Sequence, residues 1–274
     1  MLGSAIIVFR ETLEAALIIG IIAAATQALP GRNRWLAAGI AAGIAGSLVV
    51  ASLTEWIAEL AEGTGQELFN AGILGLAAVM LAWHNIWMAR HGMQLARDAR
   101  QLGKDVAEGG RAMSALAVVI ALAILREGAE TSLFLYGLLT GGEETFATVI
   151  SGGAIGLATG AAAGYALYAG FLRIPARWFF AATSGLILLL AAAMASQMAR
   201  FLVQADLLPS LASPLWDSSW LLANTSALGR FLHTLIGYEA MPSGIQVVFY
   251  AATLILILIG MRLCRLQPQI PRTA

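Results

Sequence analysis

Long apolar runs follow one another along the chain, and short polar segments separate them. Most of the runs reach the roughly 20 residues that an α-helix needs to cross the hydrocarbon core of a membrane. Hydropathy predicts seven membrane-spanning helices, at residues 2–28, 35–53, 68–88, 114–139, 146–172, 178–201 and 245–263. The predicted fold class is therefore an all-α membrane protein, with one transmembrane domain over residues 1–274.

Composition excludes an ordinary soluble protein. Charged residues make up 12% of the chain and hydrophobic residues 59%, whereas soluble domains carry about 25% charged residues. The formal net charge is zero, so bulk charge does not point to nucleic acid, and the expected surroundings are a lipid bilayer. Cys264 is the single cysteine, so an internal disulfide is impossible.

Basic residues are concentrated in alternate loops. The first, third and fifth loops and the C-terminal tail hold 12 of the 16 Lys and Arg residues, and the second and fourth loops hold none. Because cytoplasmic loops carry an excess of Lys and Arg, this bias predicts an external N-terminus and a cytoplasmic C-terminus in the cell inner membrane. The segment 89–113 becomes a cytoplasmic linker, expected to continue as a solvated amphipathic helix.

The first apolar run is expected to stay in the mature protein as a helix. Charged residues interrupt it, and no basic segment precedes it, whereas a cleavable signal peptide has a basic start and an uninterrupted apolar core.

Residues 202–244 form the largest of the loops predicted on the external side of the membrane. Thr225-Ser226 and Gly237 are typical of the start and the end of a short helix within that loop.

The first and fourth predicted helices carry the same charged motif. It reads Arg10-Glu11-Thr12-Leu13-Glu14 in the first and Arg126-Glu127-Gly128-Ala129-Glu130 in the fourth. A charge at the middle of a bilayer costs about 2.5–3.5 kcal/mol even on the lenient insertion scale. Six such side chains are therefore expected to face one another or water.

The two motifs are predicted to form one site. Residues three and four positions apart share a helix face, so each motif gathers its arginine and its two glutamates. At about 1.5 Å per residue, both motifs lie roughly 12 Å below the outer face of a ~30 Å core. Four carboxylates outnumber two guanidiniums, so the pocket is expected to bind a cation. The alternative is a pair of structural ion pairs that only hold helices together.

The same two helices run in opposite directions, because an odd number of crossings separates their starts. Helices one to three and four to six are therefore predicted to be inverted repeats, an arrangement that places sites at the repeat interface, and the seventh helix is an addition. Glycines in the fifth helix are expected to permit close helix contacts. They are Gly152, Gly153, Gly156, Gly160 and Gly164.

Carboxylate oxygens are hard ligands that suit hard cations. The predicted metal ligands are Glu11, Glu14, Glu127 and Glu130, with Arg10 and Arg126 as their ion-pair partners. These ligands alone do not exclude manganese, magnesium or calcium. The motifs contain no His or Cys, which argues against a site built for zinc or copper.

Other polar residues are candidates for the ion's route. The acidic residues of the second external segment either concentrate cations at an entrance or form a solvated helix face; they are Glu55, Glu59, Glu62 and Glu67. His84, deep in the third helix, either lines the pathway or is a hydrogen-bonded packing residue. His84 and His91 share one face of a single helix, which is not the arrangement that holds a haem.

With both motifs in place, the chain resembles the oxidase-dependent iron permeases, in their short bacterial ferrous-iron permease form. That family has seven spans with Arg-Glu-x-x-Glu in the first and fourth, and the resemblance also includes Glu67-Leu68-Phe69, Trp87-Met88, Gly237-Tyr238 and Pro242-Ser243. It implies iron uptake with the motif glutamates as iron ligands, iron (Fe³⁺/Fe²⁺) as transported substrate rather than cofactor, and an external iron-oxidising or iron-delivering partner. Asn70 and Gln204 depart from the family pattern, which usually has acidic residues there.

The expected function is therefore high-affinity iron import rather than enzymatic catalysis. Within transport, the alternatives are a carrier of another hard cation such as manganese, or a proton-coupled cation exchanger. A membrane redox enzyme would need cofactor ligands, and the sequence contains no credible paired histidines, Cys pair or nucleotide-binding Gly motif.

Overall fold

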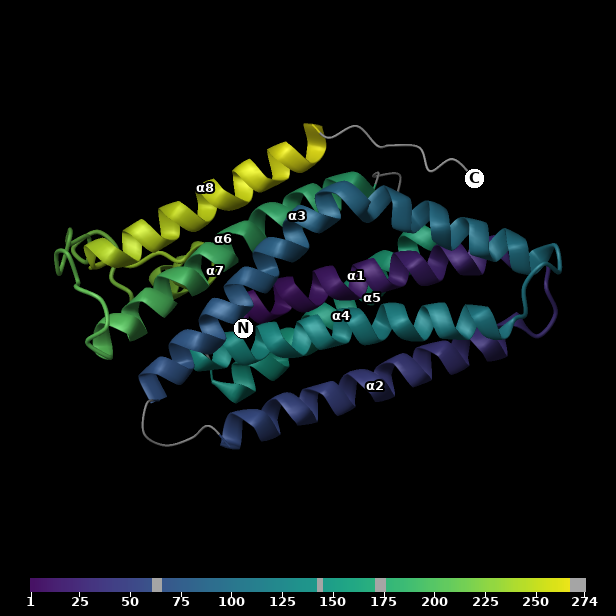
Figure 1. Ribbon diagram of the computed structural model, residues 1–274, viewed down its shortest axis with the longest axis horizontal. Helices are drawn as coiled ribbons and strands as arrows, with labels where there is room; N and C mark the ends of the chain where they lie inside the picture. Colours follow the sequence, from purple (N-terminus) through teal and green to yellow (C-terminus); the bar gives the residue numbers. More distant parts are fainter. Residues whose placement is uncertain (61–65, 142–144, 171–175, 267–274) are drawn as a thin grey trace.

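The chain folds into an elongated bundle of α-helices (Figure 1). The computed structural model describes residues 1–60, 66–141, 145–170 and 176–266, and no strand occurs among them. The helices are α1 (Leu2–Ala25), α2 (Arg32–Leu60), α3 (Gln66–Ala107), α4 (Ser114–Thr140), α5 (Phe146–Tyr168), α6 (Ala176–Gln204), α7 (Ala227–Ile236) and α8 (Gly244–Leu266). The predicted all-α fold class is confirmed.

Five helices in the described part of the chain are long and apolar enough to cross a membrane: α2, α3, α5, α6 and α8. Two more, α1 and α4, have comparable lengths of 24 and 27 residues, but each carries the three charges of one motif. Such charges are tolerated in a bilayer only when they face the interior of the bundle. The seven-span count therefore stays a prediction.

The packing of the first six helices follows two inverted repeats. α1 packs mainly against α5, α2 against α4, and α3 against α6, while α1 and α4 also touch. In an inverted repeat α1 corresponds to α4, α2 to α5 and α3 to α6. Under this correspondence the α1–α5 contact becomes the α4–α2 contact, and the α3–α6 and α1–α4 contacts map onto themselves. α1 and α4 run in opposite directions (Figure 1). α8 lies against α3 and α6, outside this arrangement.

The sequence keeps a trace of this repeat in α3 and α6. Met88-Ala89-Arg90 begins thirteen residues after Gly75, and Met198-Ala199-Arg200 begins thirteen residues after Gly185.

Glycines bring the paired helices into backbone contact. A Cβ atom at Gly160 of α5 would lie 2.7 Å from the carbonyl oxygen of Phe9 in α1, and one at Gly39 of α2 would lie 2.7 Å from the carbonyl oxygen of Ala117 in α4. Both distances are shorter than real Cβ contacts, so only glycine fits at these positions. The expected role in close packing is confirmed for Gly152, Gly156, Gly160 and Gly164 but not for Gly153, and glycines of α2 make similar close contacts.

α3 runs past the predicted membrane span and continues through most of segment 89–113, as expected for a helical continuation. Its second half is amphipathic but not fully solvated: Ala99, Leu102 and Val106 are buried against Ile22 of α1 and Leu116 of α4. These three positions recur at helical spacing on one face. This part of α3 therefore packs within the bundle. Segment 89–113 was expected to be solvated, and that expectation is wrong for its buried face.

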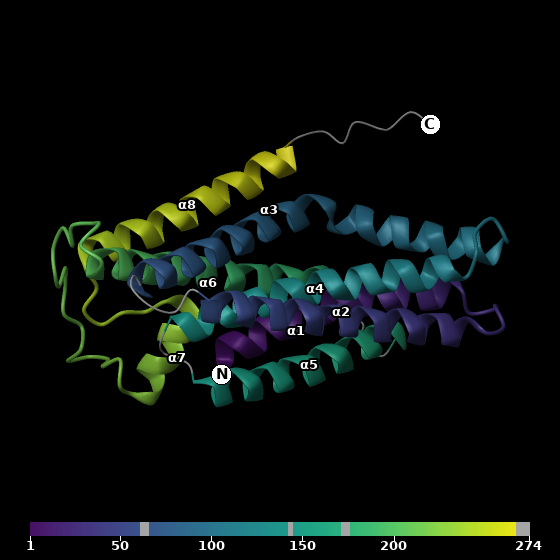
Figure 2. The same ribbon diagram turned by 60° about the horizontal axis from the view of Figure 1, so that its bottom comes forward.

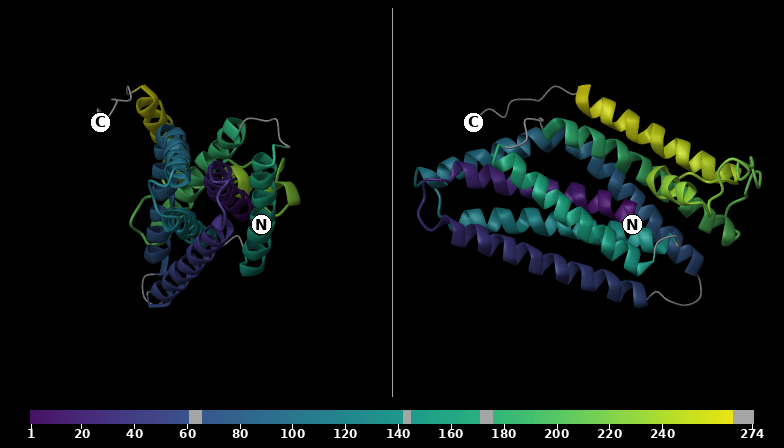
Figure 3. Two further views of the ribbon diagram at one scale, coloured as in Figure 1. Left: turned by 90° about the vertical axis from the view of Figure 1, so that its right-hand side faces the viewer. Right: turned by 180° about the vertical axis from the view of Figure 1, so that it is seen from behind.

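The predicted short helix in segment 202–244 is present as α7. The Ser226 hydroxyl accepts a hydrogen bond from the Gly229 amide at 2.9 Å, and Gly237 ends the helix in the left-handed conformation with φ of 71°. Figures 2 and 3 show α7 and the loop before it at the end of the bundle where α1 begins. The predicted start and end signals are confirmed.

Candidate metal centre

The two charged motifs meet in the interior of the bundle, where α1 contacts α4. Only 1% of the surface of Arg10 and of Glu11 is exposed, and Glu14 and Glu127 are 3% and 4% exposed. The motifs lie well inside their helices and face each other because the helices are antiparallel neighbours. The first motif and Glu127 are thus withdrawn from the surface, whereas the side chains of Arg126 and Glu130 are 33% and 15% exposed.

Each motif makes the same local ion pair. Arg10 Nε lies 3.0 Å from Glu14 Oε1, and Arg126 Nε lies 3.1 Å from Glu130 Oε1. Both pairs join residues four positions apart, which are neighbours on one helix face. A second contact reaches the remaining glutamate of each motif, at 3.3 Å from Arg10 Nη1 to Glu11 and at 3.7 Å from Arg126 Nε to Glu127.

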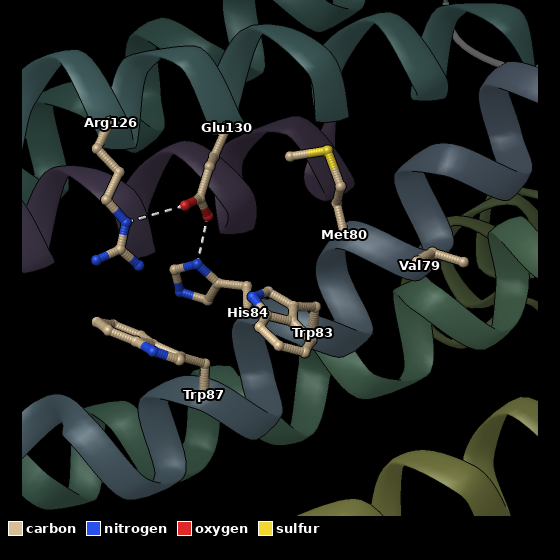
Figure 4. Close-up of a pocket in the computed structure, with 7 residues that line it drawn as sticks. All are labelled: Val79, Met80, Trp83, His84, Trp87, Arg126 and Glu130. Carbon is tan, nitrogen blue, oxygen red and sulfur yellow. Dashed lines mark hydrogen bonds and ion pairs between the residues drawn. The ribbon is translucent and has the colours of Figure 1, made fainter.

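His84 of α3 connects the two motifs. Its Nδ1 atom contacts Oε2 of Glu130 on α4, and its Nε2 atom lies 3.6 Å from Oε2 of Glu14 on α1. Figure 4 shows the imidazole beneath the Glu130–Arg126 pair. The next residue, Asn85, donates a hydrogen bond from Nδ2 to the Ser184 carbonyl oxygen at 2.9 Å and so ties α3 to α6 at this depth.

A possible ligand set lies at the centre of this network. Glu11, His84, Glu127 and Glu130 each present one donor atom, and these atoms all lie within 4.8 Å of one another. Glu11 and Glu127 each retain a buried Oε2 that accepts no hydrogen bond from the described residues. An unsatisfied buried carboxylate oxygen is costly, and a bound cation would compensate it.

The structure differs from the four-glutamate set in two respects. Glu14 is directed at Arg10 and His84 and adjoins the cluster of donor atoms rather than joining it. His84, expected only as a candidate for the ion's route or for packing, contributes a nitrogen donor to the cluster, and the set of four glutamate ligands stays a prediction. The motifs themselves contain no histidine; the imidazole comes from a third helix.

A cavity of about 410 Å³ opens beside the cluster, between α3 and α4. Its lining residues are Val79, Met80, Trp83, His84, Trp87, Arg126 and Glu130 (Figure 4). The Arg126 guanidinium lies 4.4 Å from the centre of the Trp87 ring, which stacks on His91 at 4.8 Å. Trp87 follows His84 by three residues and shares its helix face, which is the sequence signal that could have placed it near the site.

Of the four proposed entrance residues, the structure describes the side chain of Glu67, which is not part of this centre. Glu67 is exposed at the start of α3, far along that helix from His84. The side chains of Glu55 and Glu59, and all of Glu62, lie outside the described residues. Asn70 is partly buried in α3, and Gln204 is the exposed last residue of α6. The role of these positions in ion entry stays a prediction.

Comparison with known proteins identifies relatives of matching length. The ferrous iron permease EfeU of Escherichia coli O6:H1 is 29% identical over 260 residues, which cover 93% of each chain. EfeU of Yersinia pestis is 29% identical over 261 residues, covering 93% of this chain and 90% of its own. No solved structure matches the chain. The model of the iron permease FTR1 family matches residues 1–268, so this protein belongs to the FTR1 iron permease family.

Proposed function

We propose that this protein imports iron and that Glu11, Glu127, Glu130 and His84 hold the ion during its passage. The observation that carries this proposal is the convergence of one donor atom from each residue within 4.8 Å, in the interior of the bundle. Family membership and relatives named as ferrous iron permeases support iron as the cargo.

The donor chemistry fits a first-row transition metal. Carboxylates alone suit magnesium, calcium and manganese, whereas imidazole suits iron, copper, nickel and zinc. A set of three carboxylates and one imidazole combines both preferences, and ferrous iron accepts both donor types. The nitrogen of His84 therefore favours iron over magnesium and calcium, although manganese remains a competitor by the same chemistry.

The arginines have a different role from the glutamates. Arg10 and Arg126 offset part of the negative charge when no ion is present, and each holds one carboxylate by an ion pair of about 3 Å. An entering cation would separate His84 from Glu130, because both donors of that contact belong to the ligand set. The arginines would then keep Glu14 and Glu130 near the ion while His84 turns toward it.

The proposed direction is inward across the cell inner membrane, from an external N-terminal side to a cytoplasmic C-terminus. The distribution of Lys and Arg supports this orientation. An iron-oxidising or iron-delivering protein on the external side would supply the ion. The protein itself acts as a carrier, not as an enzyme.

Uptake of radiolabelled iron into proteoliposomes tests the proposal. We expect saturable uptake that Glu127→Gln reduces by at least tenfold, because one anionic donor is lost while side-chain size is kept. Glu108→Gln, at an exposed position beyond the end of α3, is the matched control and should transport normally. Uptake that is unaffected by Glu127→Gln at equal protein abundance would refute the site, and preferential uptake of manganese would reassign the cargo.

A further inference from the structure

A groove of about 480 Å³ follows α1 and α5 toward the end of the bundle where both helices finish, and none of the donor residues of the metal centre lines it. Gly20 and Ala24 of α1 and Gly164 and Tyr168 of α5 form its apolar walls, and Arg100 and Lys104 of α3 lie at its rim. Its volume falls in the range of about 300–1,000 Å³ that is usual for small-molecule sites.

Arg100 and Lys104 place two positive charges at the rim of the groove. They lie four residues apart, on one face of α3, and both are exposed. No salt bridge involving either residue occurs within the described part of the chain. Asp105, next to Lys104, is 3.6 Å from Arg111 and accepts a hydrogen bond from Gln101, while Asp98 and Glu108 on either side are exposed. The rim of the groove therefore suits an anion.

The basic pair is held in place by the packed second half of α3. Leu102 and Val106 are buried on the opposite face from solvent, next to α1. Between them, Gly103 allows α3 to lie directly against Ala25 at the end of α1. Arg100 and Lys104 are consequently fixed beside the groove rather than carried by a loose linker.

We propose that this groove binds an anionic phospholipid, with the phosphate of the head group at Arg100 and Lys104 and an acyl chain along α1 and α5. The apolar walls run from the helix ends into the apolar length of α1 and α5, and the charge is confined to the rim. A soluble anion would use the rim only, and a zwitterionic lipid would carry its own cation to the basic pair. Basic pockets between membrane helices bind anionic head groups in this way.

Native mass spectrometry of the full-length protein, with phosphatidylglycerol added to the detergent-purified protein, tests this proposal. We expect the parent protein to retain the lipid. Removing each basic side chain should weaken lipid affinity about fivefold, so Arg100→Gln combined with Lys104→Gln should weaken it roughly thirtyfold. The matched control is Arg34→Gln with Arg97→Gln, two exposed residues outside the groove, which should leave lipid binding unchanged. Equal loss in both double variants would overturn the proposal.

A second variant separates a lipid from a soluble anion. Ala24→Phe fills the apolar part of the groove and keeps both charges, so we expect it to weaken phosphatidylglycerol binding. Inorganic phosphate should not displace the lipid, and phosphatidylcholine should be retained less than phosphatidylglycerol. Displacement by phosphate, or equal retention of both lipids, would overturn the proposal. This readout does not depend on iron transport, so its failure is distinct from failure of the proposed function.

Discussion

His84 on α3 contacts Glu130 on α4 through Nδ1, while its other ring nitrogen lies 3.6 Å from Glu14 on α1. One imidazole thus contacts a carboxylate from each of the two inverted repeats. Because α3 belongs to the same repeat as α1, the contact with Glu130 is the one that crosses between repeats. The metal centre therefore depends on three helices rather than on the two that carry the motifs.

Replacing His84 by Gln should reduce iron uptake by at least tenfold at equal protein abundance. Glutamine fills a similar volume but offers no imidazole nitrogen to the ion. His91→Gln is the control, because His91 lies two turns along the same helix, stacks on Trp87 and lies 3.1 Å from the Trp87 carbonyl oxygen, and is not one of the donor residues. Radiolabelled uptake in proteoliposomes measures both variants. Normal uptake by His84→Gln would assign His84 to packing.

Glu14→Gln should reduce iron uptake, whereas Arg10→Ala should reduce the amount of folded protein. Glu14 adjoins the donor cluster, so its neutralisation should impair uptake less than Glu127→Gln does, and the protein should still accumulate. Arg10→Ala leaves buried carboxylates without their partner, and breaking a buried pair typically costs about 3–5 kcal/mol. We expect loss of folded protein, measured by size-exclusion chromatography in detergent. Equal abundance of the two variants would contradict this distinction.

Trp87→Leu should weaken uptake several-fold without unfolding the protein. The indole face holds the Arg126 guanidinium at 4.4 Å, and such contacts contribute about 0.5–2 kcal/mol. Trp83→Leu is the matched control, since Trp83 lines the same cavity but is 70% exposed. If both variants changed iron affinity equally, the role of Trp87 would be that of a cavity wall.

Gly160→Ala should lower thermal stability, because its Cβ would collide with the Phe9 carbonyl oxygen and overpacking costs about 1–3 kcal/mol. Gly72→Ala, in α3, has open space at its Cβ position and should be neutral or gain about 0.5–1 kcal/mol from helix propensity. The unfolding temperature in detergent distinguishes the two. A stable Gly160→Ala protein would contradict the close α1–α5 contact.

Reporter fusions test the orientation. A reporter after Ala274 should be cytoplasmic, and one inserted near Ser213 should be external, because Lys and Arg accumulate in alternate loops. Alkaline phosphatase and fluorescent protein fusions give opposite signals on the two sides. The reverse pattern would invert the proposed direction of transport.

The elements predicted well were those that depend on local spacing. The ion pair within each motif follows from an interval of four residues, and the ends of α7 follow from Ser226 and Gly237. The meeting of the two motifs followed from equal depth and opposite direction. Each of these features follows either from residue spacing within a single helix or from the alternating direction of successive membrane-spanning helices.

Features that depend on the rotation of a helix about its axis could not be derived in this way. α3 packs against α1, α4, α6 and α8, so its apolar positions do not define a single buried face, and the direction of His84 stayed open. The orientation of Glu14 depends on its rotamer beside Arg10. The packing of the second half of α3 was missed because hydropathy falls after residue 88, while the stripe of Ala99, Leu102 and Val106 is still buried.

The glycine contacts described above have a mechanical consequence. Glycines hold α1 against α5 and α2 against α4 through close backbone contacts, so we expect each pair to move as a rigid body. The seam between the two bodies passes between α1 and α4, which is where Glu11 faces Glu127 and Glu130. Any opening movement along this seam divides the donors between the two bodies. A single opening movement would then both lower the affinity for the ion and open a path for it.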